Sequence, residues 1–463
     1  MHAARSPVNP IIAEKISEFF NEPLPEVFER DLSLGDVQPP AKGNLVNTVV
    51  GVRRCGKTYR LYQEMRRIEA LGYPKSSMLY FNFEDERLKP YDASLLAEVV
   101  DTFFAQNPQA KEDGAFFFFD EIQEVPDWGL FLRRMVDTVK ATIYVTGSSS
   151  KMLSLDLATE FRGRALPREL FPLSFSEFAR FRGVDVPSAL ALGQSAITST
   201  QKAALRKTCD EYLLRGGFVP VQKLEPSESA LLLQEYAYRT VSYDIIERYN
   251  LANLSTASSF LAQCMASSGR ELSINKLHAR FRSQQVSVSR ETLSRLLDYY
   301  EDAYLLFTVQ DFSRALADNP RSPSKVYAVD PGMLMAFSPS ATRDVAQRLE
   351  TAVFLKLRNG STLVRHGSIS KLLFDAGSAR HEIDFVVGDA LLQSAYRLIQ
   401  VCVSMHNEKT RRREISALEA AMPRYELSES WIITLDEDED IESEAGVIHV
   451  VPAWKWLLDE GRD

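Results

Sequence analysis

Cysteine is scarce in this sequence, which has four cysteines among 463 residues. Cys55, Cys209, Cys264 and Cys402 stand singly, without the paired spacing of a zinc site or the density of a disulfide scaffold. The pattern argues against a disulfide-rich secreted domain and against a zinc-binding module. We therefore expect a protein of a reducing compartment that holds no structural metal.

Long apolar runs are also missing. The start, Met1–Pro7, lacks the apolar core of a signal peptide. No later apolar run approaches the roughly 18–20 residues that span a bilayer. We expect a cytoplasmic protein without a membrane partner.

Positive charge is in deficit, because 54 Lys and Arg residues face 63 Asp and Glu residues, which gives a formal net charge of −9. Such a chain has no global positive field to attract nucleic acid, so any nucleic-acid site must be a local basic patch. Apolar residues at 45% and charged residues at 25% are the ordinary balance of a globular protein. The length predicts two to four domains.

The first third of the chain alternates between strand-like and helix-like segments. Continuous apolar runs alternate with amphipathic helical patterns, and this alternation predicts an α/β domain with a parallel sheet covered by helices on both faces. Two short helices are expected before it, at Pro10–Phe20 and Leu24–Leu32. The expected strands are Asn44–Val50, Ser77–Phe83, Ala115–Phe119 and Ala141–Thr146, and the expected helices are Tyr59–Leu71, Ser94–Gln106 and Trp128–Val139.

A phosphate-binding loop follows the first strand. Gly51 and Gly56 stand where the backbone must wrap closely around phosphates, and Lys57 and Thr58 complete the Gly-x-x-x-x-Gly-Lys-Thr pattern. Lys57 is expected at the β- and γ-phosphates of ATP, and Thr58 at Mg²⁺, with the helix dipole adding its positive end. The residues expected to bind the nucleotide are Gly51, Arg53, Arg54, Cys55, Gly56, Lys57, Thr58 and Tyr59. Arg53 and Arg54 have the alternative of contacting a partner domain or solvent.

An acidic pair ends a central strand. Phe116–Phe119 suits a strand buried on both faces, and it runs directly into Asp120 and Glu121. Asp120 is expected to hold Mg²⁺ with Thr58, and Glu121 to orient the attacking water. The alternative is a solvated acidic turn.

Three further residues are candidates for the catalytic site. Ser148 follows the next strand and is expected to sense the γ-phosphate, although a Ser/Gly turn or a helix cap explains it equally. Arg162 and Arg164 are candidate arginine fingers for a neighbouring subunit, with an ordinary surface role as the alternative.

After Glu177 the sequence becomes mainly helical, with a turn at Arg215–Pro220 and a long helical stretch at Leu231–Tyr249, which we expect to form a lid and connector. A helix, helix, strand, loop, strand order then suits a winged helix. Its expected elements are Leu272–Phe281, Arg290–Glu301, Tyr304–Val309, the polar loop Asn319–Ser324 and Lys325–Val329. The last part, with a helix at Val345–Leu357 and strands at Thr362–Arg365, Lys371–Phe374, Glu382–Val387, Arg397–Val403 and Ser430–Leu435, predicts a small separate α/β domain.

Basic residues in the winged-helix region are candidate DNA contacts. They are Arg280, Arg282, Arg290 and Arg295 on helices, and Arg321 and Lys325 near the polar loop. Lys409–Arg413 adds a basic run further on. Winged helices also bind proteins, and charged helix faces are often only solvated, so both alternatives stay open.

Several motifs together resemble one known family. The segments that carry the likeness are Asn47–Thr58, Leu79–Asp85, Phe116–Gln123, Thr146–Ser150 and Leu170–Phe178. They look like those of prokaryotic AAA-type ATPases whose C-terminal domain of unknown function combines a winged helix with a restriction-endonuclease-like module. The likeness extends from Asn44 to about Arg413. It implies a P-loop NTPase of AAA type with a helical lid, followed by those two modules.

The resemblance further implies an oligomer, since AAA-type ATPases usually complete their sites with a neighbour's arginine. The domains then expected are 1–43 (N-terminal helical segment), 44–185 (ATPase core), 186–250 (lid and connector), 251–340 (winged helix) and 341–463 (endonuclease-like).

The resemblance places Glu350, Asp384, Gln400 and Cys402 at the positions of an endonuclease-like acidic site. Such nucleases use carboxylates to hold Mg²⁺ and a lysine beside them. This chain departs from that pattern, because an amide and a thiol occupy the last two positions. Nuclease activity is therefore not expected unless Glu382 or a lysine such as Lys356 or Lys371 substitutes, and Glu350 and Asp384 have a purely structural role as the alternative.

The sequence thus predicts a Mg-dependent ATPase, with ATP and Mg²⁺ as ligands and with itself and DNA as partners, that remodels or translocates duplex or branched DNA as a homo-oligomer. One rival is an ATP-switched signalling protein with a protein-binding C-terminal half. The other is an ATP-gated, metal-dependent nuclease.

Overall fold

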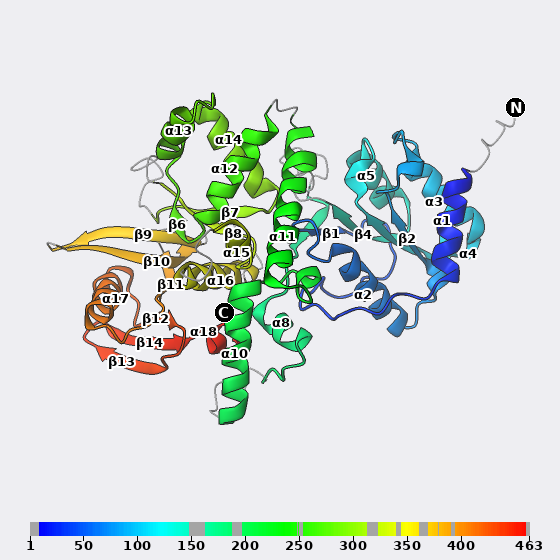
Figure 1. The fold of residues 1–463 in the computed structure, drawn as a ribbon. Coiled ribbons are helices and arrows are strands. Elements are labelled where there is room, and N and C mark those ends of the chain that lie inside the picture. Colours follow the sequence, from blue (N-terminus) through cyan, green and yellow to red (C-terminus); the bar gives the residue numbers. More distant parts are fainter. Residues whose placement is uncertain are drawn as a thin grey trace, which may run out of the picture. The chain divides into compact units, whose positions relative to one another are not determined.

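The computed structural model describes residues 9–147, 163–187, 197–247, 249, 253–312, 323–338, 344–360, 369–377, 379–389 and 394–459. They belong to two compact units, Met1–Leu170 and Phe171–Asp463, whose helices and strands are labelled in Figure 1. Among these residues no helix is both long and apolar enough to cross a bilayer.

The first unit is built on a five-stranded parallel sheet with the strand order β2-β3-β4-β1-β5. The strands are β1 (Val46–Val50), β2 (Met78–Asn82), β3 (Ala115–Asp120), β4 (Ala141–Gly147) and β5 (Ala165–Glu169). Because all of them run the same way, their carboxyl ends meet at one edge, where parallel α/β sheets bind ligands. The sheet confirms the predicted P-loop NTPase fold class.

Helices cover this sheet on both faces. They are α1 (Pro10–Asn21), α2 (Lys57–Ala70), α3 (Leu95–Gln106), α4 (Pro108–Asp113) and α5 (Trp128–Thr138), with 3-10 turns η1 (Lys75–Ser77), η2 (Glu86–Leu88) and η3 (Ile122–Glu124). Every residue of Phe116–Phe119 is fully buried. Side chains alternate between the two faces of a strand, so this run explains why both faces are apolar. Aromatic rings pack between the sheet and its helices. Phe118, for example, stacks on Tyr144 with their ring centres 4.9 Å apart.

The segment before the sheet differs from prediction at one point. A helix forms at α1, as expected, but the predicted helix at Leu24–Leu32 is wrong, since this stretch has no regular secondary structure. Side chains of α2 take up its backbone groups: Arg66 donates to Leu24 and Pro25, and Arg60 donates to Leu32. Backbone oxygens bonded in this way have no need of helical partners.

The second unit begins with helices and continues with a small sheet. The helices are α8 (Phe175–Phe181), α10 (Ser199–Arg215), η4 (Val219–Val221), α11 (Pro226–Thr240), η5 (Val241–Glu247) and α12 (Leu254–Ala266). Next come β6 (Arg270–Glu271), α13 (Ile274–Ser283), α14 (Arg290–Asp302), β7 (Leu306–Val309), β8 (Lys325–Ala328) and α15 (Met333–Phe337). The three strands form an antiparallel sheet in the order β6-β8-β7. This order of elements agrees with a winged helix, which stays a prediction.

A buried carboxylate joins two parts of this unit. Asp330, just after β8, accepts hydrogen bonds from the backbone N–H of Gly217 at 2.6 Å and of Gly332 at 2.8 Å. A Cβ on Gly216 would lie 1.7 Å from a carboxylate oxygen of Asp330, so only glycine fits there. Burial raises the pKa of Asp330 to about 7.

The remainder of the second unit is a six-stranded mixed sheet with the order β13-β14-β12-β11-β10-β9. Its elements are α16 (Val345–Gly360), β9 (Ile369–Ala376), β10 (Ala379–Asp389), β11 (Ser394–Val401), α17 (Glu408–Ala421), η6 (Pro423–Tyr425), β12 (Glu429–Thr434), β13 (Glu439–Ser443), β14 (Gly446–Pro452) and α18 (Ala453–Leu458).

Helices cover both faces of this sheet too. On one face, Ala417 and Leu418 of α17 pack with Ile383 and Leu398 in a common core. On the other, Phe354 of α16 lies 6.3 Å from Phe385 of β10, ring centre to ring centre. The predicted C-terminal α/β domain is therefore present, while the strand expected at 362–365 lies outside the described residues. The endonuclease-like assignment stays a prediction.

Candidate nucleotide site

The loop between β1 and α2 is shaped by its two glycines. A Cβ on Gly51 would lie 2.1 Å from the carbonyl oxygen of Leu170, so no other residue fits. Gly56 has a φ of 103°, a left-handed conformation that residues with a Cβ rarely adopt. The loop runs directly into the N-terminus of α2, and the free backbone N–H groups at a helix N-terminus suit an anion.

Lys57 lies inside this loop. It is buried, and its Nζ donates to the carbonyl oxygens of Gly51 at 3.1 Å and of Val52 at 3.3 Å. Its Nζ is also 3.8 Å from Oε1 of Glu121. Burial lowers the pKa of Lys57, but the nearby carboxylates, Glu121 above all, outweigh this and hold the pKa above its usual value. The ammonium therefore stays charged at neutral pH.

Three hydroxyl groups converge on Asp120 at the end of β3. Thr58 donates to Oδ2 at 2.7 Å, Tyr80 donates to the same oxygen at 2.9 Å, and Thr146 donates to Oδ1. Burial raises the pKa of Asp120, and the hydrogen bonds from Thr146, Thr58 and Tyr80 offset only part of that rise. The carboxylate is thus buried, but both of its oxygens are bonded.

Glu121 turns out of the strand toward the loop. Its φ of 52° places it in the left-handed region, and its backbone N–H donates to the Thr146 hydroxyl at 3.2 Å. Gln123 donates to Oε2 at 2.5 Å, while Oε1 faces Lys57. A non-glycine residue in this region is strained, and such strain is typical of functional sites. The carboxylate lies at the same edge of the sheet as the loop.

These residues fit a magnesium-bound nucleotide. The hydroxyl oxygen of Thr58 and the carboxylate of Asp120 are the hard oxygen ligands that Mg²⁺ prefers. The loop N–H groups and the Lys57 ammonium supply the donors that phosphates need. The P-loop ATPase fold itself implies that a nucleotide binds here.

The other residues of the loop lie around this centre. Arg53 is half-buried and pairs with Glu84 at 3.5 Å, whereas Arg54 and Tyr59 are exposed. Cys55 is buried, and burial raises the pKa of its thiol, so it is not a reactive thiolate. Its carbonyl oxygen accepts a 2.8 Å bond from Arg30, which supports the loop from behind.

Of the predicted γ-phosphate sensor Ser148 and the predicted arginine fingers Arg162 and Arg164, the structure describes only Arg164. Ser148 and Arg162 lie outside the described residues. Arg164 pairs with Asp137 at 3.0 Å, and its carbonyl oxygen accepts from the N–H of Val46 at the start of β1. It therefore lies at the amino edge of the sheet, opposite the loop of its own chain. A finger role for Arg164 requires a second subunit and stays a prediction.

Two residues of this centre were not predicted. Thr146 and Tyr80 both reach Asp120, whereas Ser148 is the polar residue that the sequence predicts for this site. Thr146 carries a usable signal, because it is polar near the carboxyl end of an apolar strand beside Asp120. Tyr80 carries none, since aromatic residues are common in strands.

Two of the predicted endonuclease-like positions, Glu350 and Asp384, come together in the second unit around an unexpected lysine. Lys325 of β8 is buried, and its Nζ lies 3.1 Å from Glu350, 3.0 Å from Glu382 and 2.8 Å from Asp384. Tyr327 donates to Glu350 at 2.7 Å. The prediction that Lys325 contacts DNA phosphate is wrong, because its ammonium is already bonded to three carboxylates.

The remaining positions of that cluster hold the sheet together. Gln400 donates to the carbonyl oxygen of Glu382 at 2.8 Å and accepts from the N–H of Asp384 at 2.9 Å, which ties β11 to β10. Burial raises the pKa of Cys402 to about 12, so its thiol is neutral. Lys371, a candidate replacement lysine, is instead bonded to Glu271 and Asp311. Among the described residues, no group of three or more His, Cys, Asp or Glu side chains could hold a metal ion.

The basic residues predicted to contact DNA differ in their exposure and in their ion pairs. Arg280, Arg282, Arg290 and Arg295 are all exposed on α13 and α14. Arg321 lies outside the described residues. The run on α17 is largely neutralised, since Arg411 pairs with Glu439, Arg412 with Glu408, and Arg413 with Glu414.

Comparison with known proteins places these features in a family. An AAA domain matches residues 43–179, and a domain of unknown function (DUF8612) matches residues 206–344. The uncharacterized protein MJ1544 of Methanocaldococcus jannaschii is 32% identical over 431 residues, covering 91% of this chain and 90% of that protein. An uncharacterized protein of Haemophilus influenzae is 25% identical over 347 residues, covering 75% and 80%.

Solved structures give weaker likenesses. The Walker-type ATPase paby2304 of Pyrococcus abyssi has a TM-score of 0.35 at 13% identity, covering 71% of this chain and 94% of that one. The ORC1 protein of Aeropyrum pernix, solved in complex with DNA, has a TM-score of 0.29 at 14% identity, covering 73% and 92%. Such scores do not establish a shared fold over the whole chain.

The predicted family resemblance is thus confirmed for the AAA-type ATPase and the domain of unknown function after it. The chain belongs to one family with MJ1544, that of P-loop AAA-type ATPases in which a domain of unknown function follows the AAA domain.

Proposed function

We propose that this chain hydrolyses ATP in a Mg-dependent reaction at the Gly51–Thr58 loop, and that Asp120 and Glu121 serve that reaction. The observation that carries the proposal is the meeting of Thr58 and Asp120 at 2.7 Å, with Lys57 and Glu121 beside them. In this proposal Lys57 holds phosphate. Thr58 and Asp120 would hold the metal ion, and Glu121 would face the attacking water.

Binding is the task of the loop. The backbone N–H groups and the ammonium of Lys57 bind the β- and γ-phosphates, and Thr58 and Asp120 hold Mg²⁺. Mg²⁺ held by these two residues would supply positive charge for the phosphate oxygens. Phosphoryl transfer needs positioning and charge stabilisation more than covalent chemistry. These fixed groups therefore supply much of the rate acceleration over the uncatalysed reaction.

Glu121 orients and polarises the attacking water. Its carboxylate is held between Gln123 and Lys57, and its backbone is fixed by Thr146. A carboxylate fixed in this way accepts the hydrogen bond of a water aimed at the γ-phosphate. Ser148 and an arginine from a neighbouring subunit, Arg162 or Arg164, complete the site in this proposal, which makes the active form a homo-oligomer.

DNA is the partner that the second unit supports best. Between Ile274 and Arg290 the chain has the basic residues Lys276, Arg280, Arg282 and Arg290 and no acidic residue, in a protein whose formal net charge is −9. The three arginines are exposed on α13 and α14. A local patch of this kind is what an acidic protein needs to bind phosphates. ATP turnover then drives remodelling or translocation of that DNA.

The ATPase rate on single-stranded, duplex and branched DNA tests this proposal. Stimulation by DNA, lost in Arg282→Ala, is the expected result. Indifference to every DNA form would favour the rival function, an ATP-switched signalling protein whose second unit binds another protein.

The Lys325 cluster argues against a nuclease. Its carboxylates are neutralised by an internal lysine, which occupies the place that a metal ion would need. The side-chain amide of Gln400 is hydrogen-bonded to the backbone of the neighbouring strand. Incubation with plasmid and Mg²⁺ or Mn²⁺ should leave the DNA intact. Cleavage that disappears in Asp384→Ala would make the chain an ATP-gated nuclease instead.

A further inference from the structure

Tyr80 shares an acceptor with the proposed magnesium ligand Thr58. Tyr80 lies in β2 and its hydroxyl donates to Oδ2 of Asp120 at 2.9 Å, while Thr58 donates to the same oxygen at 2.7 Å. The two donors come from different elements, Thr58 from α2 and Tyr80 from β2. The nucleotide loop supplies only one of them.

The bond is one of two that fix the carboxylate from outside the loop. Thr146 of β4 donates to Oδ1, so Tyr80 and Thr146 hold different oxygens of Asp120 from the strands on either side of β3. One donor on each oxygen prevents the carboxylate from rotating about its Cβ–Cγ bond. Its lone pairs then keep one direction whether or not Thr58 remains bonded to it.

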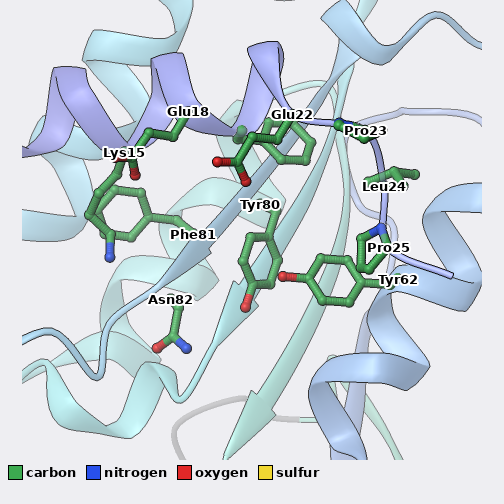
Figure 2. A pocket seen from close by; sticks show the side chains of 11 residues that line it. Lys15, Glu18, Glu22, Pro23, Leu24, Pro25, Tyr62, Tyr80, Phe81 and Asn82 are labelled. Carbon is green, nitrogen blue, oxygen red and sulfur yellow. The ribbon is translucent and has the colours of Figure 1, made fainter. Parts of the chain in front are cut away.

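The chain before the core packs around Tyr80. Its ring lines a pocket of about 170 Å³ between α1, the segment Pro23–Pro25 and α2 (Figure 2). Tyr62 of α2 lies 4.9 Å away, ring centre to ring centre. Phe19 of α1 lies 6.3 Å from the Tyr80 ring, ring centre to ring centre. The ring therefore lies beside aromatic rings of two helices, α1 and α2.

The hydroxyl of Tyr80 acts as a donor. Its hydrogen points to Oδ2 of Asp120, which is 2.9 Å away and can only accept as a carboxylate oxygen. A hydrogen bond to an ionised acceptor is shorter and stronger than one between neutral groups. Asp120 thus depends on a residue that no part of the phosphate-binding motif identifies.

We infer that Tyr80 is a positioning residue, which orients Asp120 so that the carboxylate and Thr58 together receive the magnesium ion of the nucleotide. This inference rests on the proposed ATPase function. It differs from a purely structural role, in which the hydroxyl only satisfies a buried carboxylate. A positioning role acts on magnesium-dependent binding, whereas a structural role acts on the fold.

Nucleotide affinity measured with and without magnesium separates the two roles. The probe is N-methylanthraniloyl-ADP, titrated by fluorescence into the full chain in Mg²⁺ and in EDTA. Tyr80→Phe keeps the ring and its packing, so affinity in EDTA should stay within about twofold of wild type. The gain in affinity that Mg²⁺ gives should fall by about tenfold, the usual worth of a hydrogen bond to a charged group.

Matched variants sharpen the comparison. Tyr62→Phe removes a hydroxyl from the same pocket that does not reach Asp120, and it should keep the magnesium gain. Thr146→Val removes the donor to the other oxygen, and it should lose the gain as Tyr80→Phe does. Thermal unfolding in EDTA should give similar midpoints for all of these proteins.

The outcomes are distinct. Equal loss of affinity by Tyr80→Phe in Mg²⁺ and in EDTA, or an unchanged magnesium gain, would overturn the positioning role. If the wild-type protein itself shows no gain with Mg²⁺, the proposed ATPase function fails first, whatever Tyr80 does.

Discussion

The hydroxyl of Thr58 donates a 2.7 Å hydrogen bond to the carboxylate of Asp120, a residue 62 positions later in the chain. The bond joins the start of α2 to the end of β3, two elements on neighbouring parts of the same sheet edge. It brings together the two oxygen groups that would hold a magnesium ion. The proposed mechanism is built around this contact.

Lys57→Ala should abolish tight nucleotide binding. The substitution removes a buried ammonium whose pKa is held above its usual value, and with it a charge-assisted bond to phosphate. Affinity for ATP, measured by calorimetry, should fall by about 10–100-fold. Lys140→Ala is the matched control, because Lys140 is an exposed lysine at the amino edge of the same sheet. If Lys57→Ala binds as wild type does, the nucleotide site lies elsewhere.

Arg282→Ala and Arg290→Ala should each reduce the salt dependence of DNA binding. Each phosphate contact adds about one to the slope of log affinity against log salt concentration, so each variant should lower that slope by about one. Fluorescence anisotropy with labelled duplex DNA measures it. Arg412→Ala should leave the slope unchanged, because Arg412 is paired with Glu408. A slope that none of these variants alters would remove α13 and α14 from the interface.

Lys325→Met should destabilise the second unit strongly. It leaves Glu350, Asp384 and Glu382 facing one another without their cation, and breaking a buried ion pair in this way costs about 3–5 kcal/mol. Denaturant unfolding measures the loss. Arg412→Met, which breaks an exposed pair, should cost about 0.5 kcal/mol or less. Equal costs for the two variants would show that the Lys325 cluster contributes no more than a surface pair.

Asp330 should make stability depend on pH with a definite sign. Its pKa is raised by burial from 3.8 to about 7, so the folded protein keeps a proton that the unfolded chain releases. Its contribution to stability is therefore fully present below about pH 4 and is lost as the pH rises toward 7. The free energy of unfolding of wild type relative to Asp330→Asn should fall over that range. A constant or rising difference would contradict the raised pKa.

The sequence was most informative where local pattern and chemistry coincide. The apolar run before Gly51 and the run before Asp120 each predicted a buried strand, and parallel strands bring their carboxyl ends to one edge. Lys57, Thr58, Asp120 and Glu121 therefore could be predicted to meet, and in the structure they do.

The failures arise from long-range contacts. Leu24–Leu32 has a helical pattern, but its carbonyl oxygens are taken by arginines of α2, which no local signal reveals. Lys325 follows a polar loop in the sequence, which suggests an exposed cation. In the structure it meets Asp384, 59 positions later, because β8 packs against β10 and α16. A single sequence carries no information on such pairs beyond residue type. Tyr80 escaped notice for the same reason.

ATP hydrolysis by the wild-type protein and by Glu121→Gln, each in Mg²⁺ and in EDTA, tests the central claim most directly. Wild type should release phosphate in a Mg-dependent reaction, and kcat should fall by about 10²–10⁴-fold in Glu121→Gln. ATP affinity should be retained in the variant, because the phosphate donors and the metal ligands are untouched. Turnover that is independent of Mg²⁺, or a Glu121→Gln variant as fast as wild type, would contradict the central claim.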